Sequence, residues 1–67
     1  MTLTAIIMPD PNGGYVAQNP ETGTTTQGKT VAEAIVNLKE ATELYLEEFP
    51  LTQVGQTLMT SFEIANA

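Results

Sequence analysis

Residues 30–50, TVAEAIVNLKEATELYLEEFP, decide the fold, because they carry the longest helical pattern in the chain. Thr30 and Glu33 form a T-x-x-E capping box, in which a hydroxyl and a carboxylate accept hydrogen bonds from otherwise unpaired backbone amides. Pro50 ends the pattern, since proline does not continue a helix. The segment therefore predicts a helix over residues 31–48.

Apolar side chains recur along this segment with the period of an α-helix and indicate which side faces the core. They fall on one stripe, formed by Val31, Ala34, Ile35, Leu38, Thr42, Tyr45 and Phe49. A helix with one such stripe needs another layer of structure to cover it.

Turn signals divide the residues before the helix into three short segments of strand character. The strongest turn is PDPNGG at residues 9–14, because Asn and Gly tolerate positive φ. The predicted strands are residues 2–8, 15–18 and 24–27, with a second turn at 19–23. Since the third strand is entirely polar, we expect it at an edge of the sheet.

After the helix, residues 57–65 (TLMTSFEIA) alternate in character and predict a last strand. Leu58, Phe62 and Ile64 share one face of it with Thr60. The sequence thus predicts a single domain over residues 1–67 of the α+β class, with the order β-β-β-α-β. One helix should pack on one face of a small antiparallel sheet.

Both faces of the first predicted strand are partly apolar. Leu3, Ala5 and Ile7 point to one side, whereas Ile6 and Met8 point to the other. Because one helix covers only one face, we predict that Ile6 and Met8 form an interface with a second copy of the chain.

The composition weighs against several classes of function. The chain has no cysteine and no histidine, so disulfides and thiolate zinc sites are excluded, and the commonest general base is missing. We therefore expect no enzyme, no metal and no cofactor. The net charge is −6 with only two lysines and no arginine, so direct binding of nucleic acid is not expected.

The N-terminal apolar run is short and has no cationic start. A membrane span needs about 20 apolar residues, so we expect neither a span nor a signal peptide, and a cytoplasmic location.

The predicted outer face of the helix carries the candidate partner-binding residues, which are Val36, Glu40, Glu43, Leu44 and Glu47. Two apolar side chains two turns apart with carboxylates around them are typical of an apolar contact with an acidic rim. An ordinary solvated face that provides solubility is the other interpretation.

Short motifs along residues 3–49 resemble, in order, the pattern of the HicB-like antitoxin family. They are Gly13-Gly14-Tyr15-Val16-Ala17, Asn19-Pro20-Glu21, Gln27-Gly28-Lys29-Thr30, Glu33-Ala34, Asn37-Leu38-Lys39-Glu40-Ala41 and Glu43-Leu44-Tyr45-Leu46-Glu47. The resemblance implies a truncated ribonuclease-H-like fold and assembly into dimers or tetramers. It also implies a partner, a small basic HicA-like toxin that cleaves messenger RNA and whose active site the antitoxin occludes.

Three functions remain open on the sequence. The first is an antitoxin of a HicA–HicB type II toxin–antitoxin system. The second is an orphan oligomeric HicB-like domain with a structural or sensing role and no toxin. The third is a carboxylate-dependent nuclease.

Overall fold

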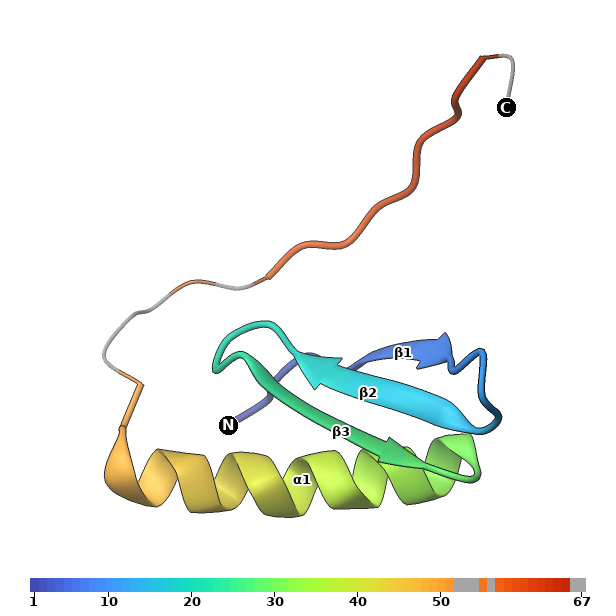
Figure 1. Ribbon diagram of the computed structural model, residues 1–67. Coiled ribbons are helices and arrows are strands. Elements are labelled where there is room, and N and C mark those ends of the chain that lie inside the picture. The colour runs from blue at the N-terminus through green and yellow to red at the C-terminus, as the bar shows by residue number, and fades with distance from the viewer. Residues whose placement is uncertain (52–54, 56, 66–67) are drawn as a thin grey trace.

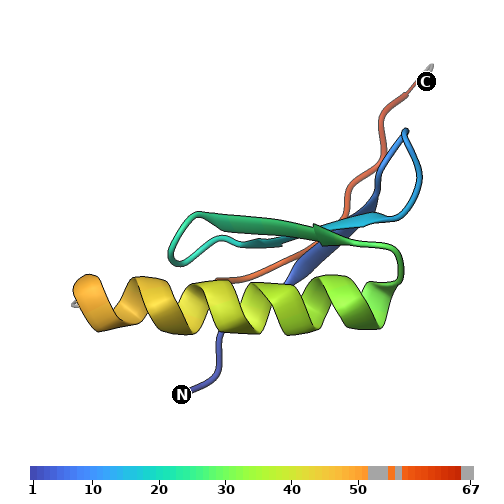
Figure 2. The same ribbon diagram turned by 60° about the horizontal axis from the view of Figure 1, so that its bottom comes forward.

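The computed structural model describes residues 1–51, 55 and 57–65 of the chain. Its elements are β1 (Ile6–Pro9), β2 (Tyr15–Asn19), β3 (Thr24–Gly28) and α1 (Val31–Glu48). The strands form an antiparallel sheet in the order β1-β2-β3. Figures 1 and 2 both show α1 lying along one face of this sheet. The predicted α+β class, with three strands followed by one helix, is confirmed.

The two predicted turns are present and connect the strands. In the first, the Asp10 N–H donates to the Gly14 carbonyl at 2.9 Å, and the Gly13 N–H donates to the Asp10 carbonyl at 2.9 Å. Gly13 and Gly14 have φ values of 102° and 80°, which favour glycine. In the second, the Gly23 N–H donates to the Asn19 carbonyl at 2.8 Å.

The first strand is shorter than predicted and begins at Ile6 rather than at residue 2. Ile6 lies opposite Gln18, so in the same register Thr4 would lie opposite Pro20. Proline has no amide hydrogen to donate to the ladder. The antiparallel ladder therefore stops here, and Thr4 is held by side chains instead.

The helix has the predicted bounds, and the Thr30 half of its capping box is formed. The Glu33 N–H donates to the Thr30 hydroxyl at 3.1 Å. The Glu33 carboxylate accepts the Lys29 N–H at 3.0 Å, one residue before the cap. At the other end, the Phe49 N–H donates to the Tyr45 carbonyl.

The core is small and lies where α1 crosses β2 and β3. Ala17, Ala34 and Leu38 are buried, and Ile7 and Tyr15 pack against them. The predicted apolar stripe is only partly covered. Ala34, Leu38 and Thr42 are buried, whereas Val31, Ile35, Tyr45 and Phe49 are exposed.

The helix overhangs the sheet because of its length. Eighteen residues of α1 span about 27 Å, while a five-residue strand such as β2 spans about 17 Å. Tyr45 and Phe49, near the C-terminal end of α1, pack on one another with ring centroids 5.1 Å apart. This end of the stripe therefore lacks a covering layer among the described residues.

The prediction of a last strand over residues 57–65 is wrong for this structure. In the described part of the chain no strand follows α1, and Figure 1 shows the segment running clear of the sheet. A strand requires a neighbour that pairs with its backbone, and this segment pairs with none of the described strands. β1 consequently lies at one edge of the sheet and β3 at the other, the latter as predicted.

Candidate partner-binding site

The outward face of α1 presents two apolar side chains among carboxylates, as predicted. Val36 is 62% exposed and Leu44 is 59% exposed, and Glu40 and Glu47 are exposed beside them. Ala34, Leu38 and Thr42, the buried residues of α1, lie on its opposite side. The structure thus brings together four of the five residues predicted for partner binding. We call Val36, Glu40, Leu44 and Glu47 the acidic helix face.

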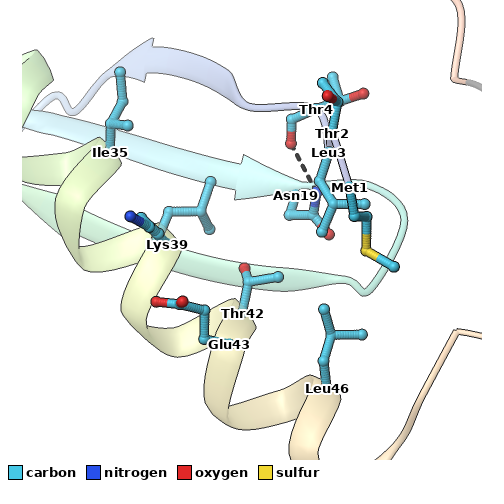
Figure 3. A pocket seen from close by; sticks show the side chains of 11 residues that line it. Met1, Thr2, Leu3, Thr4, Asn19, Ile35, Lys39, Thr42, Glu43 and Leu46 are labelled. Carbon is cyan, nitrogen blue, oxygen red and sulfur yellow. Dashed lines mark hydrogen bonds between the residues drawn. The ribbon is translucent and has the colours of Figure 1, made fainter.

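Glu43, the fifth predicted residue, lies at the border of this face. Its side chain is exposed, but it also lines a hollow beside α1 (Figure 3). The helical wheel placed it among the outward residues, and the hollow on its other side could not be read from the sequence.

Ile6 and Met8 lie on the face of the sheet that α1 does not cover. Ile7, between them, packs against the core, so its two neighbours point the other way. Met8 is 47% exposed, and Ile6 is half-buried. Their predicted role in an interface between copies stays a prediction.

A hollow of about 520 Å³ opens between the N-terminal segment and α1 (Figure 3). Its apolar walls include Leu3, Ile35 and Leu46. Thr42 also lines it, and the buried hydroxyl of Thr42 has no hydrogen-bond partner among the described residues. A buried hydroxyl without a hydrogen-bond partner is unfavourable. An occupant with apolar groups and one hydrogen-bonding group would therefore stabilise the fold by covering the apolar walls and pairing with Thr42.

A buried polar cluster fixes the 19–23 turn against the N-terminal segment. Asn19, only 1% exposed, donates from Nδ2 to the Thr4 carbonyl at 2.7 Å and to Glu21 Oε1 at 2.6 Å. Its Oδ1 accepts from the Thr22 N–H at 2.8 Å and from the Thr22 hydroxyl at 2.6 Å. From the sequence, Asn-Pro-Glu is recognisable only as a turn. Nothing in the sequence around Thr4 indicates that its carbonyl accepts a hydrogen bond from Asn19.

Glu21 receives several hydrogen bonds that favour its charged form. The largest effect comes from the Thr57 hydroxyl, followed by the Thr4 amide and hydroxyl and then by Asn19. The Thr4 amide lies 2.9 Å from Glu21 Oε1, and the Thr4 hydroxyl lies 2.7 Å from Oε2. Together these donors lower the pKa of Glu21 from its ordinary value of 4.5 to about 2.

We expect this carboxylate to make folding stability depend on pH in the acidic range. A lowered pKa contributes stability that is present above pH 4.5 and is lost as the pH falls toward about 2. Thermal unfolding followed by circular dichroism should show a melting temperature that falls across this window, and a flatter profile for Glu21→Gln. Glu40→Gln, which removes an exposed carboxylate outside the cluster, is the matched control. Parallel profiles for the wild type and Glu21→Gln would contradict the assignment.

The described residues form neither a metal site nor a membrane-spanning helix. Within residues 1–51, 55 and 57–65, no three His, Cys, Asp or Glu side chains gather closely enough to hold a metal ion. Over the same residues, no helix combines the length and the apolar character needed to cross a membrane.

The chain is similar to proteins of three organisms. It is 48% identical over 48 residues to UPF0150 protein Ta0767 of Thermoplasma acidophilum, an alignment that covers 70% of each chain. It is 35% identical to a UPF0150 protein of Helicobacter pylori over the whole of both chains. UPF0150 protein ssl0738 of Synechocystis is 49% identical over 47 residues, which cover 69% of this chain and 65% of that protein.

These similarities define the class of the protein: the chain belongs to the UPF0150 family. No family model matches it, and no solved structure matches it. The names of the relatives state no ligand or partner, so a proposal for function rests on the surface described above and on the sequence resemblance.

Proposed function

We propose that the chain is a non-catalytic antitoxin-type protein of a HicA–HicB type II system. It acts in the cytoplasm as a homo-oligomer, a dimer or tetramer with Ile6 and Met8 at an interface between copies. It binds a small basic toxin that cleaves messenger RNA and occludes the toxin's active site. The observation that carries the proposal is the acidic helix face, where the exposed Val36 and Leu44 lie among carboxylates.

Charge and energetics support this use of the face. The chain carries eight acidic residues against two lysines, which favours a basic partner. No basic residue lies in the last turn of α1, where the helix dipole is negative and nearby glutamates cost about 0.3–1 kcal/mol each. A small domain that keeps carboxylates in an unfavourable position gains most if a cationic partner neutralises them.

The hollow beside α1 supports an alternative to the antitoxin function. A space of about 520 Å³ with apolar walls has the size of a small-ligand site. An orphan oligomeric domain with a sensing or structural role, without a toxin, would use this surface rather than the acidic helix face.

Binding to a HicA-like toxin of the source organism tests the proposal. Changing Glu40, Glu43 and Glu47 together to Gln should slow association about tenfold or more at low salt and flatten its salt dependence, because rim charges act through long-range attraction. Leu44→Ala should instead speed dissociation, with a loss of about 1–3 kcal/mol in binding free energy if Leu44 anchors the contact. Surface plasmon resonance at several salt concentrations measures both rates.

The controls separate binding from folding. Glu63→Gln removes a carboxylate outside α1 and should leave both rates close to those of the wild type. Circular dichroism should show that the triple glutamine variant remains folded. An affinity that is indifferent to salt, to the triple variant and to Leu44→Ala would rule out this face, and RNA cleavage by the purified chain with Mg²⁺ would overturn the non-catalytic assignment.

A further inference from the structure

The C-terminal segment of residues 57–65 is the most apolar exposed part of the described chain. Leu58 is 88% exposed and Phe62 is 83% exposed. Ile64 is exposed with them, and all three lie on one face of an alternating pattern. Large apolar side chains exposed together mark a surface that is covered in the functional state.

The segment diverges from its own sheet. At Thr57, which is half-buried, the segment lies near the 19–23 turn, and the Thr57 hydroxyl contributes to the lowered pKa of Glu21. Beyond this point Figure 1 shows it rising on the side of the sheet away from α1 and separating from β1. This is the side on which Ile6 and Met8 lie. A second copy that covered these two residues would therefore be in the path of the segment.

The free edge of β1 and the hollow beside it match the backbone and the apolar side chains of this segment. Among the described strands β1 pairs only with β2, so its other edge has unpaired backbone groups that can accept another strand. Next to this edge is the hollow with the apolar side chains Leu3, Ile35 and Leu46. The hollow also contains the unpartnered Thr42 hydroxyl, and Thr60 provides a hydroxyl on the same face of the segment as Leu58 and Phe62.

We propose that two copies exchange their C-terminal segments. Residues 57–65 of one copy add to the free edge of β1 of the other and become the fourth strand of its sheet. Leu58 and Phe62 then fill the hollow against Ile35 and Leu46, while Met59 points to the opposite side, toward Ile6 and Met8. Because each copy gives a segment and receives one, the exchange closes as a twofold dimer. Neither the sheet nor the hollow is complete in one chain alone.

The proposal specifies how copies assemble and does not depend on a toxin. Loss of toxin binding with an intact exchange would affect only the proposed function. Loss of the exchange with intact toxin binding would affect only this inference.

The absence of cysteine from the sequence allows a direct test. One full-length chain carries Ala5→Cys beside β1, and a second chain with an affinity tag carries Thr60→Cys. After the two are mixed, unfolded and refolded together, a short bis-maleimide should join the tagged and untagged chains. Thr25→Cys on β3, in place of Ala5→Cys, is the matched control and should give little product. A cross-link that forms only within a chain carrying both Ala5→Cys and Thr60→Cys would overturn the exchange, because the segment would then close on its own sheet.

A second measurement tests the side chains assigned to the hollow. Light scattering should show a dimer for the wild type. Leu58→Asp and Phe62→Asp should each raise the dimer dissociation constant by about tenfold or more. Each substitution replaces a large apolar side chain that is buried in the dimer with a charged one. Ser61→Asp, on the opposite face of the same segment, is the control and should change the constant much less. A wild-type monomer, or a dimer equally sensitive to all three substitutions, would contradict the proposal.

Discussion

Replacement of Gly28 by alanine is expected to destabilise the domain by about 2–3 kcal/mol. A Cβ atom at this position would lie 2.6 Å from the backbone nitrogen of Ala34 and 2.9 Å from the carbonyl carbon of Glu33. Both atoms belong to the first turn of α1, so no side chain can rotate to make room. The end of β3 would have to move away from α1, which would open the core at Ala17 and Ala34.

The loss is a large fraction of the stability available to so small a domain, which is only a few kcal/mol. Urea unfolding followed by the helical circular dichroism signal measures it. Gly55→Ala is the matched control, because a Cβ at Gly55 meets no atom of the described residues within 4 Å. It should shift the unfolding midpoint very little. Equal midpoints for the two variants would show that β3 and α1 do not approach each other as closely as described.

The parts of the fold that local sequence determines were predictable. The capping box at Thr30 and the stop at Pro50 gave the bounds of α1, because both act within one turn of the helix. Asn12, Gly13 and Gly14 gave the first turn through their backbone preferences. The outward placement of Val36 and Leu44 followed from helical periodicity alone.

The features that depend on contacts between distant residues were not predictable in the same way. The alternation in residues 57–65 predicts a strand, but the pattern does not say whether a strand edge lies within reach, and no strand is formed there in the described chain. The overhang of Tyr45 and Phe49 depends on the relative lengths of α1 and the strands. The hollow arises only when the N-terminal segment is placed beside α1. In each case the sequence does not specify which part of the fold contacts a given surface. That depends on how the elements pack against one another.

Substitution of Asn19 by alanine should cause the largest loss of stability among the changes considered, about 3–4 kcal/mol. The side chain makes four hydrogen bonds, each worth about 1 kcal/mol net and more for the one to a carboxylate. Its removal leaves the Thr4 carbonyl and the Thr22 amide without these partners and frees the N-terminal segment from the 19–23 turn.

Asn37→Ala is the matched control for this loss. Asn37 also donates from Nδ2 to a backbone carbonyl, that of Gln27, at 2.9 Å, but it does so at an exposed position. Water can replace that bond, so the control should lose no more than about 1 kcal/mol. Urea unfolding of both variants decides the matter. A loss for Asn19→Ala no greater than that for Asn37→Ala would mean that the polar cluster positions the turn without stabilising the fold.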